Sequence, residues 1–226
     1  MIPPGVKAIF FDAVGTLLHP DPPAVEVYVE VGHRFGSRLS ASAIGANFIA
    51  AFKRQDILDF ANGLATSELR ETERWRAIVA QTLEDLPDSN AVFRELFAHF
   101  SRSTSWRSDP DSAVVLAELA QRGYLLGMAS NFDSRLRSII REMPALQHIR
   151  QLVISSEVGW RKPGPQFFHA LCESAKLPPQ DICLVGDDWT NDFQGATAAG
   201  LRPLFLDSRK TGRAGAAVIH SLAQLL

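Results

Sequence analysis

The stretch that decides the fold is residues 6–16, with the sequence VKAIFFDAVGT. Its apolar part, Ala8 to Phe11, consists mostly of side chains that favour β-structure, and the turn signal Gly15-Thr16 follows Asp12 closely. A continuous apolar run bounded by a turn signal is typical of a strand buried on both faces of a parallel sheet. We therefore predict such a strand, with Asp12 just past its end.

The C-terminal half of the chain, from about residue 106 to 226, alternates between β-type and helical patterns. Alternation of this kind predicts βαβ units and hence a Rossmann-like parallel α/β sheet. The expected strands are 124–130, 152–155, 182–186 and 203–206, and the expected helices are 112–122, 134–142, 165–175 and 191–199.

Between these two parts, residues 21–104 have a helical pattern throughout. Ser40 or Ser42 can cap one helix, and Thr66-Ser67 precede another. The segment contains no convincing strand pattern. We therefore predict an α/β core formed by residues 1–20 and 105–226, with residues 21–104 inserted as an all-helical domain.

Polar side chains stand just past the ends of the expected strands. Ligands bind outside the carboxyl ends of parallel strands, so these residues are candidates for a shared site. They are Asp12 after the first strand, Ser130 and Asn131 at 124–130, Lys162 in the loop after 152–155, and Asp187 and Asp188 after 182–186.

The composition excludes several classes of protein. Of the 226 residues, 46% are hydrophobic and 21% are charged, and the formal net charge of −2 comes without a basic block. These values indicate a globular protein and argue against a nucleic-acid partner. No apolar run is long enough to span a membrane, and residues 1–7 do not resemble a signal segment. Cys172 and Cys183 are expected to be reduced, as in a cytoplasmic protein.

Four motifs in the order of the chain resemble those of the haloacid dehalogenase-like superfamily, and the resemblance covers essentially the whole sequence. Any one of them alone is weak, but all four in order, each at the end of an expected strand, are specific. In that family a helical cap closes over the site, which corresponds to residues 21–104. The motifs are Phe11-Asp12-Ala13-Val14-Gly15-Thr16-Leu17, Ala129-Ser130-Asn131, Arg161-Lys162-Pro163-Gly164-Pro165 and Val185-Gly186-Asp187-Asp188-Trp189-Thr190-Asn191-Asp192.

The resemblance implies a hydrolase that acts on a small molecule, with the Asp12 carboxylate as the nucleophile. It also implies Mg²⁺ as the cofactor, which suits oxygen ligands and offsets the repulsion between Asp12 and an anionic substrate. The implied ligands are the carboxylates of Asp12 and Asp187 and the backbone carbonyl of Val14, with Asp188 or Asp192 holding metal-bound waters.

The remaining motif residues have implied roles around the substrate. Ser130 would donate a hydrogen bond to the substrate oxyanion, and Asn131 would lie beside it. Lys162 would add positive charge to the same group and steady Asp12.

One position departs from the family pattern. Phosphatases of this family carry an aspartate two positions after the nucleophile, which protonates the leaving group, and this chain has Val14 there. General acid–base help is worth roughly 10²–10⁴-fold, so ordinary alkyl phosphates are expected to be poor substrates.

Because of Val14, three functions stay open at this stage. They are a magnesium-dependent phosphatase-like hydrolase, a carbon–halogen or carbon–phosphorus hydrolase of the same fold, and a non-catalytic metal- or phosphate-binding homologue. Lys53 is the one lysine of the insert that a phosphonate hydrolase could use.

Other polar and aromatic residues of the insert are given structural roles. We expect Lys53, Arg54, Arg70 and Arg74 to be solvated, and Trp75 and Phe52 to pack helices together. The sequence does not predict the substrate or the oligomeric state.

Overall fold

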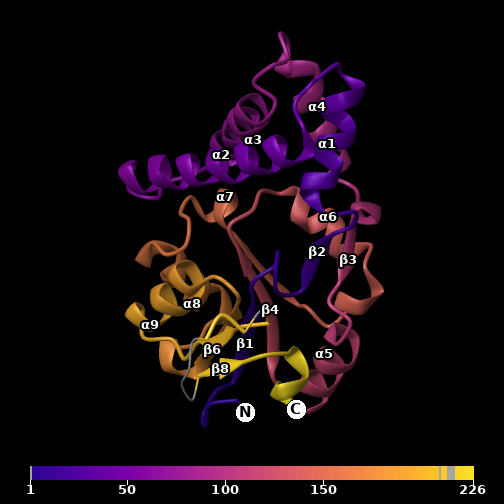
Figure 1. The fold of residues 1–226 in the computed structure, drawn as a ribbon. Helices are drawn as coiled ribbons and strands as arrows, with labels where there is room; N and C mark the ends of the chain where they lie inside the picture. Colours follow the sequence, from indigo (N-terminus) through magenta and orange to yellow (C-terminus); the bar gives the residue numbers. More distant parts are fainter. Residues whose placement is uncertain (1, 209, 213–216) are drawn as a thin grey trace.

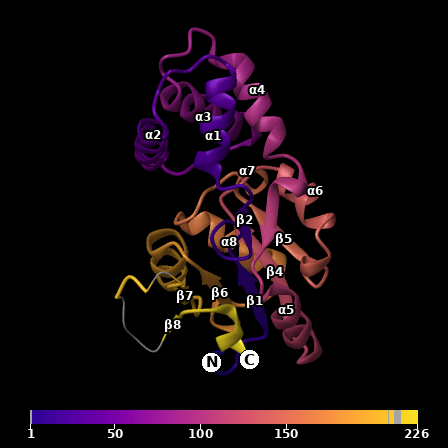
Figure 2. The same ribbon diagram turned by 45° about the vertical axis from the view of Figure 1, so that its right-hand side comes forward.

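The computed structural model describes residues 2–208, 210–212 and 217–226. Its core is a six-stranded parallel sheet with the strand order β5-β4-β1-β6-β7-β8 (Figure 2). The strands are β1 (Ala8–Phe11), β4 (Leu125–Ser130), β5 (Gln151–Ile154), β6 (Ile182–Gly186), β7 (Leu204–Leu206) and β8 (Val218–Ile219). The predicted parallel α/β sheet is therefore confirmed.

Strand β1 is buried on both faces, as its apolar sequence predicts. Ile9 and Phe11 belong to one buried cluster, whereas Ala8 and Phe10 belong to a second, because successive side chains of a strand point to opposite faces. All four residues are fully buried.

Helices cover both faces of the sheet, and the core also contains several short 3₁₀ turns. The helices of the core are α5 (Ser112–Gln121), α6 (Arg135–Arg141), α7 (Ser155–Val158), α8 (Pro165–Ala175), α9 (Gly195–Ala198) and a π-helix (Trp189–Gln194). The 3₁₀ turns are Ser103–Ser105, Pro144–Leu146, Pro179–Asp181 and Leu222–Leu225.

The insert is helical and has its own buried apolar cluster. Figures 1 and 2 show it as a separate lobe beyond the carboxyl ends of the strands. Ser40 and Ser67 cap the second and third of its helices by accepting hydrogen bonds from Ala43 N and Arg70 N. The helices are α1 (Ala24–Arg34), α2 (Ala41–Ala61), α3 (Glu68–Thr82) and α4 (Ser89–His99). The combination of a parallel α/β core and an inserted helical lobe is the predicted fold class.

Two short strands lie where the chain passes between the core and the helical lobe. Strands β2 (Leu18–Pro20) and β3 (Trp106–Ser108) form an antiparallel pair. They hold the outgoing and returning segments together. None of the helices in the described part of the chain is long and apolar enough to cross a membrane.

Candidate active site

The order of the strands brings the predicted site residues to one edge of the sheet. From β1 the chain adds β4 and β5 on one side, then returns to place β6 on the other side of β1. Ligands bind at such a switch point in open α/β sheets. Asp12 follows β1 directly, Asp187 follows β6, and Ser130 ends β4.

Lys162 is the centre of the site. Its side-chain amine donates to Asp12 Oδ1 at 2.7 Å, to Asp192 Oδ1 at 2.5 Å and to the carbonyl of Ala129 at 2.8 Å. Burial alone would lower the pKa of Lys162, but the charges of Asp12 and Asp192 outweigh burial and raise that pKa. The lysine is therefore a fixed positive charge beside the Asp12 carboxylate.

Three carboxylates converge beside this lysine. One oxygen each from Asp12, Asp187 and Asp192 lies within 4.8 Å of the others. Burial raises the pKa of Asp187 to about 6, and the negative charge of Asp12 adds to that rise. A hydrogen bond from Thr16 Oγ1 at 3.1 Å partly opposes it. Negative charge is thus concentrated here beyond what Lys162 neutralises.

The donor set fits a hard divalent cation. When all groups are ionised, three negative charges face the single positive charge of Lys162, which leaves two negative charges. Carboxylate oxygens are the ligands that Mg²⁺ prefers, and neither cysteine nor histidine belongs to this cluster. A cation bound among these carboxylates would relieve the repulsion between Asp12 and Asp187.

Two glycines make room for the acidic cluster. Gly15 has φ +95°, a left-handed conformation that few other residues adopt, and a Cβ there would collide with the Asp187 carboxylate. A Cβ on Gly186 would collide with Asp192. The two turns therefore depend on glycine to bring the carboxylates close to each other.

Asp188 lies outside the acidic cluster. It is exposed, and its carboxylate accepts hydrogen bonds from Thr190 N and Asn191 N at the start of the π-helix. Of the two residues offered for metal-bound waters, it is Asp192 whose carboxylate is buried beside Asp12.

Asn131 and Ser130 occupy different places around the lysine. The Asn131 side chain accepts from Lys162 N at 2.8 Å and donates to Lys162 O at 3.0 Å, so it fixes the backbone that carries the lysine. Ser130 is buried, and its hydroxyl makes no hydrogen bond to a described residue. That hydroxyl is available to a bound substrate. Val14, two positions after Asp12, is 38% exposed.

A buried charge network joins the helical lobe to the core, and the sequence did not reveal it. Arg161 pairs with Glu71 of α3 and lies 3.5 Å from Asp59 of α2. Arg74 pairs with the same Asp59 at 2.9 Å. The expectation that Arg74 is solvated is wrong: it is 1% exposed, because carboxylates of α2 compensate its charge. The one indication of this network in the sequence was that Arg161 directly precedes Lys162, a predicted site residue.

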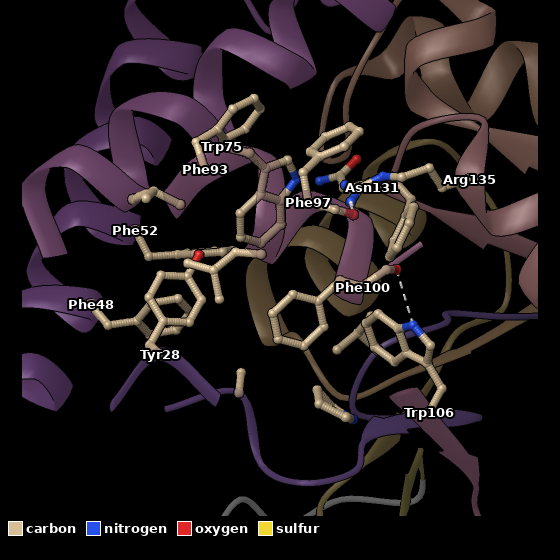
Figure 3. Close-up of a pocket in the computed structure, with 16 residues that line it drawn as sticks. Tyr28, Phe48, Phe52, Trp75, Phe93, Phe97, Phe100, Trp106, Asn131 and Arg135 are labelled. Carbon is tan, nitrogen blue, oxygen red and sulfur yellow. Dashed lines mark hydrogen bonds between the residues drawn. The ribbon is translucent and has the colours of Figure 1, made fainter. Parts of the chain in front are cut away.

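Two of the cavities among the described residues lie between the helical lobe and the core, and Asn131 lines both. One, of 210 Å³, is polar, and Lys162, Asp188 and Arg161 are among its lining residues. The other, of 260 Å³, is apolar and includes Val14 at its core end. Phe52 and Trp75, expected only to pack helices, also line the apolar cavity (Figure 3).

Comparisons with known proteins find similarity over most of the chain. The model of the haloacid dehalogenase-like hydrolase family matches residues 6–200. Haloacid dehalogenase-like hydrolase domain-containing protein 3 of Homo sapiens is 29% identical over 201 residues, which cover 87% of this chain and 80% of that protein. Phosphoserine phosphatase of Thermus thermophilus is 27% identical over 224 residues, with 89% of each chain covered.

A solved structure shares the fold over nearly its whole length. The HAD-hydrolase YfnB of Bacillus subtilis bound to magnesium superposes with a TM-score of 0.75 at 13% identity, covering 97% of both chains. The family match spans both the first strand with its aspartate and the acidic loop after β6. The chain therefore belongs to the haloacid dehalogenase-like hydrolase family.

Proposed function

We propose that this hydrolase is a magnesium-dependent, phosphatase-like enzyme that acts on a small phosphorylated metabolite in the cytoplasm, with Asp12 as its nucleophile. The observation that carries the proposal is the contact of Lys162 with Asp12 in the presence of two more carboxylates. A carboxylate held by an ammonium group and backed by a cation-binding cluster is suited to attack an anionic phosphoryl group.

The chemistry proceeds in two displacements. Asp12 Oδ1 is held by Lys162, whereas Oδ2 makes no hydrogen bond to a described residue and has a lone pair for attack. In the first step Oδ2 bonds to phosphorus and the bond from phosphorus to the leaving oxygen breaks. In the second, a water oxygen bonds to phosphorus, the bond from phosphorus to Asp12 breaks, and the water loses a proton to solvent.

The surrounding residues stabilise the charge that develops on the phosphoryl oxygens. Lys162 supplies a fixed positive charge and Ser130 an uncommitted hydroxyl. Asp12 and Asp187, with the Val14 carbonyl, would hold Mg²⁺, and Asp192 would orient its waters. A bound magnesium ion would supply positive charge that draws the phosphoryl oxygens towards Asp12.

The comparisons support a phosphatase-like activity in two ways. One relative carries the name phosphoserine phosphatase, and one protein of the same fold is described as bound to magnesium. Both facts belong to those proteins and make the same chemistry reasonable here.

The alternatives have less support. A phosphonate hydrolase would need a lysine of the helical lobe near the substrate, but Lys53 is exposed and lines neither of the two cavities described above. A carbon–halogen hydrolase has no need for the third carboxylate or for the negative charge left after Lys162 is counted.

One assay separates these functions. Release of phosphate from acetyl phosphate, of halide from 2-chloropropionate and of phosphate from phosphonoacetaldehyde is measured with and without magnesium. We expect magnesium-dependent phosphate release from acetyl phosphate alone. Halide release that ignores magnesium would overturn the proposal in favour of a dehalogenase, and no release from any substrate would favour a binding protein.

Magnesium is expected to raise the melting temperature of the protein, and Asp187→Asn is expected to remove most of that rise. A ligand that binds only the folded state stabilises it, and the variant lacks one anionic ligand. The pKa of Asp187 in the folded protein, about 6, exceeds its ordinary value of 3.8. Protonated Asp187 therefore stabilises the folded state fully below about pH 4, and this stabilisation is lost as pH rises through 6. Without magnesium the variant should therefore melt above the parent at pH 7.

The matched control is Asp188→Asn, which makes the same change at the neighbouring residue outside the cluster. Asparagine also caps helices well, so the exposed turn should persist. This control should keep the magnesium-dependent shift. The same shift in Asp187→Asn as in the parent would show that the metal binds elsewhere.

Val14→Asp is expected to raise hydrolysis of alkyl phosphates more than that of nitrophenyl phosphate. The substitution adds the missing acid, which an alkoxide leaving group needs and a nitrophenolate does not, and the gain should approach roughly 10²-fold for the alkyl ester. The measurement is the ratio of alkyl to aryl turnover in variant and parent, with folding checked by circular dichroism. A ratio that stays flat would show that the missing acid does not limit this enzyme.

A further inference from the structure

Nine of the sixteen residues that line the apolar cavity beside Val14 are aromatic. Its walls come from all four helices of the lobe and from the core segments below them (Figure 3). An apolar cavity of about 150 Å³ already accommodates benzene, so 260 Å³ has room for one ring and its substituents. The rings that Figure 3 labels around the cavity are Tyr28, Phe48, Phe52, Trp75, Phe93, Phe97, Phe100 and Trp106.

The charged and amide groups of the lining are already committed. Arg135 makes two hydrogen bonds of 2.7 Å to Asp133 and one to the carbonyl of Phe97, whose ring lies 3.6 Å below its guanidinium. Asn131 is bonded to the backbone of Lys162 through both ends of its amide. A sugar or an amino acid placed here would lose its bonds to water without replacing them, which is costly.

Tyr28 differs from these groups. It is 2% exposed, yet its hydroxyl makes no hydrogen bond to a described residue. Burial raises the pKa of that hydroxyl, so it stays protonated and can donate. A hydroxyl on the wall of a cavity that makes no hydrogen bond to a described residue can donate to a ligand atom in that cavity.

The cavity also lies on the side of the leaving group. Position 14 is where phosphatases of this family carry the acid that protonates the leaving oxygen, so the leaving group passes beside this residue. Here Val14 lines the apolar cavity. Asn131 lines both this cavity and the polar cavity that Lys162 lines, so a group that departs from phosphorus beside Val14 can extend into the ring-lined space.

The absence of an acid at position 14 and the aromatic rings around the cavity favour the same kind of substrate. A phenol has a pKa near 10, as tyrosine does. An aliphatic alcohol is about as weak an acid as water, with a pKa of about 15.7. A phenolate can thus leave without a proton from position 14, whereas an alkoxide cannot.

Resting on the proposed function, we propose that the substrate is a phosphate monoester of a phenol, with its aromatic ring in the cavity and a polar ring substituent at the Tyr28 hydroxyl. Asp12 Oδ2 bonds to phosphorus while the bond from phosphorus to the phenolic oxygen breaks. The phenolate keeps the electron pair and takes its proton from solvent after it leaves.

The test compares three esters with magnesium present. Phenyl phosphate has both the ring and the good leaving group, benzyl phosphate has the ring but an alcohol leaving group, and glycerol 1-phosphate has neither. We expect kcat/KM to fall at least about 100-fold from phenyl to glycerol phosphate. Benzyl phosphate should keep the same KM as phenyl phosphate but lose kcat. Equal or better turnover of glycerol 1-phosphate would overturn the inference.

Acetyl phosphate keeps this test separate from the proposed function, because it is activated and has no ring. Its hydrolysis depends on Asp12 but not on the cavity. If acetyl phosphate is cleaved while phenyl phosphate is no better than glycerol 1-phosphate, the inference fails and the proposed function stands. If acetyl phosphate is not cleaved at all, the proposed function fails and the inference with it.

Ala24→Trp adds a ring at the cavity wall and should lower kcat/KM for phenyl phosphate far more than kcat/KM for acetyl phosphate. The matched control, Ala113→Trp, adds the same ring at an exposed site on α5 and should change neither. A filled cavity that leaves phenyl phosphate turnover intact would contradict the placement of the ring.

Tyr28→Phe keeps the packing and removes only the hydroxyl. It therefore tests recognition of the ring substituent even if Ala24→Trp prevents folding. For hydroquinone monophosphate, whose ring carries a second hydroxyl, KM should rise by roughly 2- to 12-fold, the worth of one hydrogen bond. For phenyl phosphate, KM should not change. Tyr124→Phe, outside the cavity lining, is the control. An equal loss for both esters would show that Tyr28 acts only in packing.

Discussion

Replacing Asp12 by asparagine is expected to reduce turnover of acetyl phosphate to background, a loss of roughly 10⁴-fold or more. A neutral amide has almost no nucleophilic character towards phosphorus, and the neighbouring carboxylates already accept hydrogen bonds, Asp187 from Thr16 and Asp192 from Lys162. Asp187 and Asp192 are the neighbouring carboxylates of the cluster, and Asp192 is held by Lys162 at 2.5 Å. The measurement is phosphate release at saturating substrate, with the melting temperature recorded on the same samples.

The structure indicates that this variant should still fold. An asparagine Oδ1 can accept the hydrogen bond from Lys162 that Asp12 Oδ1 accepts at 2.7 Å. The change also removes the negative charge that helps to raise the pKa of Asp187. A folded Asp12→Asn protein with near-normal turnover would end the covalent mechanism.

Lys162→Met is expected to reduce both activity and stability strongly. Methionine removes the positive charge that lies beside Asp12 and the developing phosphoryl charge, which should cost on the order of 10²-fold or more in kcat. It also leaves the buried Asp12 and Asp192 carboxylates without their partner. Breaking a buried pair by removing one member costs about 3–5 kcal/mol. The free energy of unfolding, measured by denaturant titration, should therefore fall by that amount.

Lys7→Met is the matched control for that variant. Lys7 pairs with Asp181 at 2.7 Å, the same distance as the pair of Lys162 with Asp12, but its side chain is 66% exposed. Solvent screens such pairs, so this variant should stay within about 1 kcal/mol of the parent in stability and keep its activity. Equal stability losses in the two variants would show that burial of Lys162 does not matter.

The core of the fold could be predicted because its strands are unbroken apolar runs that end in polar residues. Strand β6 begins and ends where its pattern indicates, at Ile182 and Gly186, and α8 does so at Pro165 and Ala175. Strands β2, β3 and β8 have only two or three residues each and carry no periodicity that could be detected.

The acidic loop shows the limit of sequence patterns at a site. Asp187, Asp188 and Asp192 stand close together in the sequence, and only the geometry of the π-helix turns Asp192 inward and Asp188 outward. The expected helix at 191–199 is instead this π-helix followed by α9. The contact between Asp192 and Lys162 joins a residue of the π-helix to one in the loop before α8, so sequence spacing does not reveal it.

Two features of the helical lobe, its buried charge network and its apolar cavity, could not be predicted from the sequence for a similar reason. Arg74 looks like a charge on an exposed helix face until Asp59, fifteen residues earlier on another helix, is placed beside it. Phe52 and Trp75 have the spacing of packing residues, and they do contact each other. That the rings of four helices leave a cavity between them depends on how the helices cross, which their individual sequences do not determine.

The proposed mechanism requires Asp12 to become covalently phosphorylated during turnover. Its most direct test is to quench the enzyme with acid during hydrolysis of acetyl phosphate with magnesium and to map the phosphoryl group by peptide mass spectrometry. We expect the mass of one phosphoryl group on the peptide that contains Asp12, absent without magnesium and absent in Asp12→Asn. A phosphoryl group on another residue, or steady turnover with none on Asp12, would contradict the mechanism.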